Sequence, residues 1–469
     1  AQTASREPIV LLRDYTTGGT FNSGSINRTV DLNGHTWTCT GTDANSAAFE
    51  INYSNNTLTV KNGKIVSSQL VGLIPSAMGG TIKYDNSGLV FENVQMSTTA
   101  TSGIETNGNN TNDTVTLINS TLNVPNGFGI YFPSSGKLTI DKSTINAKTM
   151  GVQVCAGSLS INAGSTITVS GDAVPKTEGD GAIQDGAAIS IVDRTGYKGL
   201  GTVAVTGGKF TAKAKNNALK AYKWENQAEG VFDNSNNIIA VSGGTFTNDV
   251  SAYVPDGYIY NSETKTVESL GETNAVAKIV GDDETTTYYK TLADAFAAAE
   301  NDEATTITML NDVELPNYIY IKDKKDVTLD LNGHNITHTG YGVFYVGNAK
   351  FHVTGKGTIF ENQKDGYAPI LAKGSPEDVA DYTTITIDED VTLKGDYAGI
   401  FVDTDTNGKG SYHNYGLVIN LKGSIDLTTI ESGVSGYGVY VQGLNKTTTG
   451  NVMHINLDGA RIKTGCEAI

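Results

Sequence analysis

The sequence predicts an all-β protein made of two tandem β-solenoid units, with a short capping helix before the second unit. Three observations predict this fold: short runs of alternating β-branched residues, glycine-rich and asparagine-rich turns between the runs, and a long-range duplication. Alternation of apolar and polar side chains is typical of strands that bury one face. Recurrence of such runs at roughly 20 to 30 residues indicates coils that stack on one another.

The predicted strands are short and occur throughout the chain. Representative runs are residues 58–60, 115–118, 137–140, 158–161, 202–205, 384–387 and 418–421. A second short run often follows a turn, as residues 64–66 follow Asn62-Gly63. This rhythm favours a solenoid over a meandering sandwich, in which tight two-residue hairpins would join longer strands.

The duplication divides the chain. Residues 31–36 (Asp-Leu-Asn-Gly-His-Thr) recur almost unchanged as residues 330–335, and residues 9–14 resemble residues 307–312. We therefore expect a first unit over residues 1–262, a polar linker over 263–290, and a capping helix with the second unit over 291–469. Comparison of the two units further predicts that the first lacks its N-terminal cap and the second its last coils.

One helix is expected, at residues 292–300. This segment is rich in alanine and places Leu292, Ala295, Phe296 and Ala299 on one stripe. A solenoid end exposes apolar core and open strand edges, so it needs a cover. We interpret the helix as the cap of the second unit.

Composition excludes several classes of partner. The chain has 469 residues with 54 glycines, 9 prolines and a net charge of −17, so nucleic acid and anionic membranes are poor partners. The absence of a run of about 18 apolar residues predicts no membrane insertion. The cysteines Cys39, Cys155 and Cys466 lie far apart, which argues against a disulfide framework or metal cluster and favours buried free thiols.

Several segments carry a resemblance to known proteins. They are residues 289–296, 310–313, 330–334, 243–246, 249–253 and 256–258. These residues resemble the pectin-lyase-like right-handed parallel β-helix superfamily, and in particular the multi-repeat cell-surface proteins of gut and oral Firmicutes. The resemblance implies two right-handed parallel β-helices in a secreted, extracellular protein that is associated with the bacterial cell wall.

The sequence favours binding over catalysis. Tyrosine is common, with 22 residues, and offers a flat apolar ring with a polar tip that suits sugars and proteins. We expect ligand contacts at tyrosines near turns of the second unit: Tyr318, Tyr320, Tyr341, Tyr397 and Tyr437. The alternative is that about half of the second unit's tyrosines face the core.

A calcium loop is the one cofactor prediction. Asp403, Asp405 and Asn407, followed by Gly408, match the start of a calcium-binding loop with oxygen ligands at alternate positions. The terminal acid of that motif is missing, since its position is occupied by Asn414. The alternative is an ordinary Asp/Asn/Gly turn.

No catalytic residue is assigned from the sequence. Asp180 and Asp185 in a glycine-rich loop, and residues 388–390 in a turn, are the acidic candidates for a polysaccharide hydrolase or lyase. The histidines His35 and His334 occupy matched positions, which we interpret as coil corners. We expect an adhesin or stalk that binds glycan or a host surface protein, with an enzyme as the alternative and an end-to-end filament subunit as the second alternative.

Overall fold

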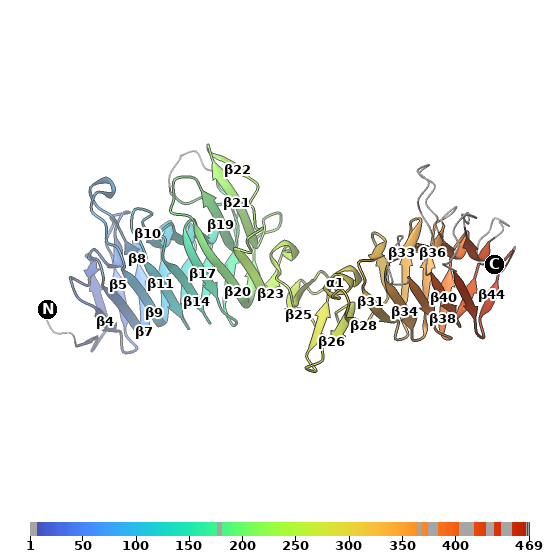
Figure 1. Cartoon of the computed structure of the whole chain (residues 1–469). Helices are drawn as coiled ribbons and strands as arrows, with labels where there is room; N and C mark the ends of the chain where they lie inside the picture. The colour runs from blue at the N-terminus through green and yellow to red at the C-terminus, as the bar shows by residue number, and fades with distance from the viewer. Residues whose placement is uncertain are drawn as a thin grey trace. The chain divides into compact units, whose positions relative to one another are not determined.

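The computed structural model describes residues 7–175, 181–363, 367–373, 383–402, 417–427, 436–441, 453–465, 467 and 469. The chain divides into two compact units, Ala1–Ser269 and Leu270–Ile469. In each unit the chain passes in turn through three faces of a coil, and most strands pair in parallel with the equivalent strand of the next coil (Figure 1). The predicted fold class, an all-β protein built from parallel β-helices, is therefore confirmed.

In the first unit, a 16-stranded sheet covers two faces of the coil. Long strands pass round the corner between these faces: β7 pairs with β4 through its first half and with β5 through its second. The strands are β1 (Ile9–Val10), β2 (Tyr15–Thr17), β4 (Arg28–Asp31), β5 (Thr36–Cys39), β7 (Thr57–Ser67), β9 (Gly88–Thr98), β11 (Thr114–Ile118), β12 (Thr121–Val124), β14 (Lys137–Asp141), β15 (Thr144–Ala147), β17 (Gly157–Ile161), β18 (Thr166–Val169), β20 (Leu200–Thr211), β23 (Ile239–Phe246), β24 (Tyr258–Asn261) and β25 (Thr266–Ser269).

A 9-stranded sheet forms the third face of the first unit. Its strands are β3 (Phe21–Asn22), β6 (Ala47–Glu50), β8 (Leu70–Ile74), β10 (Ser102–Thr106), β13 (Phe128–Phe132), β16 (Met150–Val154), β19 (Ile189–Arg194), β21 (Leu219–Glu225) and β22 (Ala228–Gly230). Two single-turn 3₁₀ helices, η1 (Met78–Gly80) and η2 (Ser251–Tyr253), interrupt the coils.

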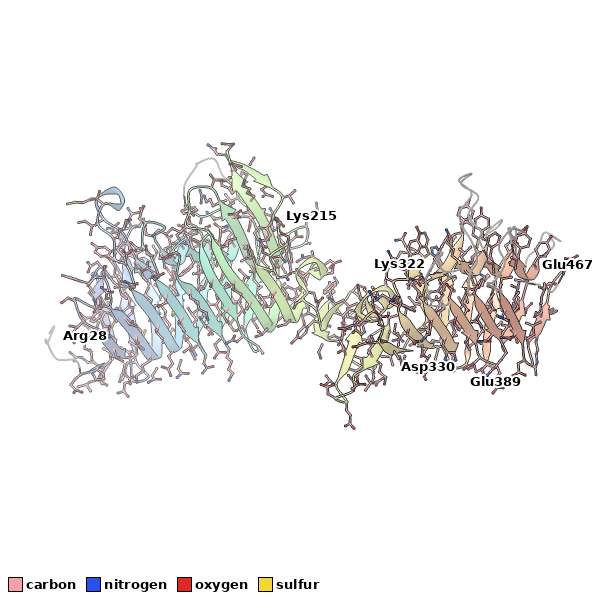
Figure 2. The ribbon with its side chains drawn as sticks, viewed as in Figure 1. Arg28, Lys215, Lys322, Asp330, Glu389 and Glu467 are labelled. Carbon is pink, nitrogen blue, oxygen red and sulfur yellow. The ribbon has the colours of Figure 1, made fainter. Side chains whose placement is uncertain are left out.

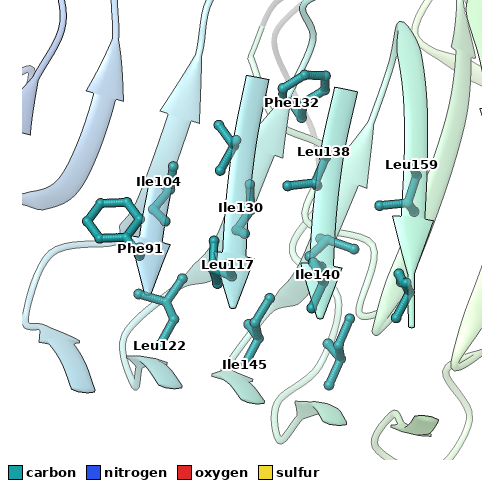
Figure 3. Close-up of a cluster of buried hydrophobic side chains, with 14 of the residues drawn as sticks. Phe91, Ile104, Leu117, Leu122, Ile130, Phe132, Leu138, Ile140, Ile145 and Leu159 are labelled. Carbon is teal, nitrogen blue, oxygen red and sulfur yellow. The ribbon is translucent and has the colours of Figure 1, made fainter. Parts of the chain in front are cut away.

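The core of the first unit is a set of stacked apolar columns. Equivalent side chains of successive coils, such as Phe91, Leu117 and Ile140, are fully buried one above another (Figure 3). Each buried branched side chain is worth roughly 1.5–3 kcal/mol against its exposed state. The thin core is thus stabilised by repetition along the coil rather than by thickness.

Asparagine side chains form a ladder at one corner of this unit. Asn62, Asn93 and Asn119 have φ angles of 58°, 55° and 45°, in the left-handed region that asparagine tolerates better than most residues. The Asn93 amide donates to Oδ1 of Asn62 at 3.3 Å, and the Asn119 amide donates to Oδ1 of Asn93 at 2.7 Å. The turn and the stacking of coils are therefore stabilised by the same side chains.

The second unit has three separate sheets. The 8-stranded sheet contains β26 (Ala277–Val280), β27 (Thr286–Tyr289), β28 (Ala304–Met309), β31 (Asp326–Asp330), β34 (Lys350–Thr354), β37 (Thr384–Ile387), β40 (Val418–Leu421) and β43 (His454–Leu457). The 6-stranded sheet contains β29 (Val313–Leu315), β32 (Asn335–His338), β35 (Gly357–Glu361), β38 (Val391–Lys394), β41 (Ser424–Asp426) and β44 (Arg461–Lys463). The 5-stranded sheet contains β30 (Ile319–Ile321), β33 (Gly342–Gly347), β36 (Ala368–Lys373), β39 (Ala398–Val402) and β42 (Tyr437–Val441).

The helix α1 (Leu292–Ala298) packs on the core of the second unit, as predicted. Thr291 caps its N-terminus by accepting a hydrogen bond from the backbone N–H of Asp294 at 3.1 Å. The Phe296 ring lies 5.6 Å from that of Phe344 and 6.1 Å from that of Phe351, measured between centroids. The Lys325 ammonium donates to the carbonyls of Phe296 and Ala299 near the helix end.

Residues 263–290, expected to be an irregular linker, instead contain strands. β25 forms antiparallel pairs with β23 and β24, and β26 forms antiparallel pairs with β27 and β28. The alternating pattern of these strands is weak because their exposed faces carry many threonines and charged residues. The division between the units falls within this segment, between Ser269 and Leu270.

Candidate functional site

Aromatic side chains gather on the outer face of the 5-stranded sheet of the second unit. The strand register places Tyr320, Tyr345, Leu371, Phe401 and Tyr440 opposite one another on successive strands. Neighbouring residues such as Ile370 and Ile400 are buried in the core, so these five side chains point outward. We call these five residues the aromatic row.

Further tyrosines flank this row and extend it into a continuous surface. Ring centroids lie 4.7 Å apart for Tyr318 and Tyr345, 5.1 Å for Tyr320 and Tyr345, and 5.3 Å for Phe401 and Tyr440. Four other pairs have similar distances between ring centroids. The distance is 5.5 Å for Tyr341–Tyr367 and for Tyr397–Tyr437. It is 5.2 Å for Tyr367–Phe401 and for Tyr397–Tyr440. We call the row and these flanking tyrosines the aromatic face.

The aromatic face is open to solvent at one part and tightly packed at another. Tyr318, Tyr320, Tyr341 and Tyr367 are between 43% and 55% exposed, whereas Phe401 is 6% exposed. Burial, reinforced by a hydrogen bond to Tyr440, raises the pKa of Tyr397 to about 12. Its phenol is thus even harder to ionise than that of an ordinary tyrosine, and it keeps its hydrogen-bond donor.

The five tyrosines predicted as ligand contacts all lie on this face. Ring contacts join Tyr318 and Tyr320 to Tyr345, and a second set of ring contacts joins Tyr341, Tyr397 and Tyr437 through Tyr367 and Phe401. Leu371 stands in register between Tyr345 and Phe401 and connects the two sets. Sequence reasoning missed Tyr367, Phe401 and Leu371 as members of the same surface. Their membership follows from strand register between coils of unequal length, which the spacing of tyrosines alone does not reveal. The role of these side chains in ligand binding stays a prediction.

Charge separates the aromatic face from the rest of the second unit. Residues 270–469 contain 28 acidic and 15 basic residues, whereas residues 1–269 contain 22 and 18. The aromatic row itself contains no charged residue. Lys322, which directly follows β30, and the acidic Asp330 and Glu389 lie on opposite sides of the unit in Figure 2. Among the described residues, the aromatic row is thus an uncharged strip on a unit that carries an excess of negative charge.

The equivalent face of the first unit carries a different row. Its outward side chains, in register, are Asn22, Glu50, Leu73, Glu105, Tyr131, Gln153, Ser190 and Lys220. Burial raises the pKa of both Glu50 and Glu105 above the ordinary value for glutamate. These two carboxyl groups stand two strands apart, with Leu73 between them. They are the acidic pair that sequence reasoning missed, since 55 residues separate them along the chain.

Asp185, an acidic candidate from the sequence, is held in a buried network. Its carboxylate accepts hydrogen bonds from the Ser190 hydroxyl at 2.6 Å, the Tyr222 hydroxyl at 3.0 Å and the Ala187 backbone N–H at 3.0 Å. It is 9% exposed. These hydrogen bonds tie Asp185 to β19 and β21, which is a structural role. The other loop candidate, Asp180, lies outside the described residues.

The remaining acidic candidates, residues 388–390, form the expected turn between β37 and β38. Asp388 accepts a hydrogen bond from Nε2 of His352 at 2.8 Å, while Glu389 and Asp390 are exposed. In the part of the chain that the structure describes, no hydrogen bond or ion pair joins the side chains of these three to one another. Their arrangement is that of a solvated corner.

The paired histidines mark the same corner in both units, as interpreted from the sequence. Nδ1 of His35 lies 3.5 Å from Oδ1 of Asp14, and Nδ1 of His334 lies 3.3 Å from Oδ1 of Asp312. In each unit this aspartate also accepts a hydrogen bond from the backbone N–H of the residue after the histidine. The N···O distance is 2.9 Å in the first unit and 2.8 Å in the second. The matched geometry explains the duplicated motif by turn formation.

Metal ligands and thiols give no further site in the described part of the chain. No group of three or more His, Cys, Asp or Glu side chains there is arranged to hold a metal ion. Asp403, Asp405 and Asn407, the predicted calcium ligands, lie outside the described residues, so calcium binding stays a prediction. Cys39 and Cys155 are buried free thiols, as expected, whereas Cys466 lies outside the described residues. Among the described residues, no helix has the length and apolar character needed to span a membrane.

Comparison with known proteins adds two loose structural similarities. No protein-family model matches the chain, and no curated protein matches it either. The A-module of the mannuronan C-5 epimerase AlgE6 from Azotobacter vinelandii is 10% identical, with 95% of this chain and 91% of that chain covered and a TM-score of 0.22. A PL6 family alginate lyase is 8% identical, with 99% and 97% covered and a TM-score of 0.12. Similarity at this level carries no argument about this chain, so the parallel β-helix assignment rests on the strand pairing described above.

Proposed function

We propose that the protein binds a neutral glycan along the aromatic face of its second unit. The observation that carries the proposal is the aromatic row, which continues in register across all five strands of its sheet without a charged residue. Pyranose rings expose apolar C–H faces that stack on flat aromatic rings, while tyrosine hydroxyls pair with sugar hydroxyls. The fixed register makes this surface preorganised, which lowers the entropic cost of binding.

The geometry favours a polymer over a single sugar. Neighbouring strands lie about 4.8 Å apart, a step close to the length of one pyranose unit. A glycan lying along the stack of coils would therefore contact one side chain of the row, which we call a rung, with each sugar. Many shallow contacts of this kind add up through avidity rather than through one deep pocket.

Charge supports a neutral rather than an acidic glycan. The second unit has an excess of 13 acidic residues, which repels polyanions at low ionic strength. We further propose that the protein acts outside the cell, as a cell-wall-associated adhesin. The alternatives to this proposal are that the ligand is a host protein, or that the protein assembles end to end into filaments.

The test is a binding titration with neutral oligosaccharides of increasing length. We expect Tyr320→Ala and Tyr440→Ala each to weaken binding about fivefold to tenfold, because each removes one stacked ring. Affinity should rise with chain length up to about the number of rungs and then level off. Tyr53→Ala is the matched control, since Tyr53 is a 47% exposed tyrosine of the first unit. Equal loss in the control, or binding that ignores chain length, would contradict the proposal.

A second candidate function, glycoside hydrolysis, is favoured by Glu50 and Glu105. Two strand spacings of about 4.8 Å separate the backbones of these residues by about 10 Å, close to the upper limit of roughly 9.5 Å between the carboxyl groups of inverting hydrolases. The raised pKa values suit a general acid. Release of reducing sugar from any polysaccharide, abolished by Glu50→Gln and by Glu105→Gln but retained in Glu92→Gln, would establish it. Absence of product across a broad polysaccharide panel would remove it.

A further inference from the structure

An open groove lies on the 6-stranded sheet of the second unit, a different sheet from the aromatic face. Its volume is about 630 Å³, which is within the range of ligand-binding sites. The lining residues are Asp312, Val313, Glu314, Asn335, Thr337, Thr358, Phe360, Asn362 and Lys394. They come from β29, β32, β35, β38 and the residues next to them, so the groove runs across the strands.

The groove is built around one register row with opposite charges at its ends. Glu314, Thr337, Phe360 and Lys394 stand opposite one another on four successive strands. Their neighbours along each strand, such as Leu315 and Ile359, are buried, so the row points outward. A negative charge thus stands at one end of the row and a positive charge at the other.

Neither terminal charge is neutralised within the described part of the chain. No ion pair there involves Glu314, which is exposed, or Lys394, which is half-buried. Asp312 adds negative charge at the Glu314 end: hydrogen bonding to the Asn335 backbone N–H keeps the pKa of its carboxyl below the ordinary value. The two ends therefore attract a cationic and an anionic group, respectively.

The middle of the groove offers an aromatic ring among neutral polar groups. The half-buried Phe360 side chain lies between Thr337 and Lys394 in the row. Thr358 on β35 and Asn362, which directly follows that strand, flank it and line the same groove. Hydroxyl and amide groups of this kind donate to and accept from amide N–H and C=O groups.

The charge separation sets the length of the complementary ligand. Three strand spacings place the backbones of Glu314 and Lys394 about 14 Å apart. An extended peptide spans about 3.3 Å per residue, so its terminal ammonium and carboxylate match this distance at three or four residues. A neutral glycan offers no charge to either end.

We propose that this groove binds a short extended peptide of three or four residues with free termini, its ammonium toward Glu314 and its carboxylate toward Lys394. The site is separate from the aromatic face, so the inference stands whether or not that face binds glycan. Phe360 supplies the apolar contact in the centre, and the threonine and asparagine side chains pair with the peptide bonds.

The test is calorimetric titration of the full chain with tetra-alanine, N-acetylated tetra-alanine and C-amidated tetra-alanine. We expect free tetra-alanine to bind most tightly, and loss of either terminal charge to weaken binding about fivefold. In Lys394→Met the C-amidated and free peptides should bind equally, while blocking the N-terminus should still matter. Glu314→Gln should show the reverse pattern.

Matched variants keep the test specific. Lys422→Met and Glu389→Gln remove exposed charges of the same unit outside the groove and should leave all three affinities unchanged. No saturable binding of tetra-alanine, equal affinity for its free and blocked forms, or displacement of tetra-alanine by a neutral oligosaccharide would each overturn the proposal. Circular dichroism of each variant shows that loss of binding is not loss of folding.

Discussion

At the scale of single residues, the corners of the coils depend on asparagine. Asn93 occupies a left-handed conformation and its side chain bonds to both neighbouring rungs of the ladder. Other L-residues pay about 1 to 2 kcal/mol for that conformation. The sequence shows this dependence only indirectly, through the frequent asparagines in turns. A single sequence does not distinguish an asparagine that only forms a turn from one that also bonds to asparagines of the neighbouring coils.

We predict that Asn93→Ala costs about 2 kcal/mol of folding free energy and that Asn93→Gly costs less. Both variants lose two side-chain hydrogen bonds, but only alanine adds the strain of a positive φ angle. Urea denaturation of the two variants beside the wild-type protein measures the difference. A larger cost for glycine than for alanine would show that the strain argument is wrong.

Asp113 is a buried carboxyl that opposes folding at neutral pH. It is fully buried, and burial together with repulsion from Asp85 raises its pKa from the ordinary 3.8 to about 7, although the backbone N–H of Ser87 and nearby side chains hydrogen-bond to it. The nearby Lys198 ammonium donates instead to Asn109 and Asn110 carbonyls and the Thr111 hydroxyl. Because the folded state holds this proton more tightly than the unfolded state, folding loses stability as pH rises from about 4 to about 7.

We therefore predict that Asp113→Asn stabilises the protein at pH 8, by up to about 4 kcal/mol. The gain should shrink as pH falls and vanish near pH 4, where aspartic acid is protonated in both states. Thermal unfolding of both proteins across this pH range is the measurement. A constant difference between them at every pH would rule out titration of Asp113 as the cause.

At the scale of elements, the capping helix was predictable because its signal is local. Leu292, Ala295 and Phe296 lie on one helical stripe, and all three are buried. The strands of residues 263–290 were not predictable in the same way, since their antiparallel partners are not adjacent repeats. The aromatic face was predictable only in part. The sequence showed that tyrosines are frequent near turns of the second unit, but which of them share one face depends on strand register between coils of different length.

We predict that Phe296→Ala destabilises the second unit by about 3 to 5 kcal/mol, because it removes a buried ring that packs on Phe344 and Phe351. Phe296→Leu should cost less. Both tryptophans, Trp37 and Trp224, belong to the first unit, so their fluorescence reports that unit alone. We expect the unfolding transition seen by circular dichroism to shift while the tryptophan transition stays in place. A shift of both would mean that the two units unfold together.

At the scale of the whole molecule, duplication explains how much the sequence revealed. The repeated Asp-Leu-Asn-Gly-His motif predicted two equivalent corners, and the structure shows the same aspartate contacts at His35 and His334. The candidate sites were harder to foresee because they lie where the two copies differ. Glu50 and Glu105 in the first unit, and Tyr345 and Phe401 in the second, are rungs of equivalent faces with unrelated chemistry.

The outward rungs have a consequence for how such a protein can change over time. A side chain on the aromatic row, or on the equivalent row of the first unit that contains Glu50 and Glu105, lies outside the inward-facing apolar columns. Its replacement therefore leaves the β-helix fold intact. Each coil can therefore vary its outward residue without changing the inward columns of the coils above and below. Specificity can then be rewritten one rung at a time, and a duplicated unit can take up a new ligand while its sister keeps the old one.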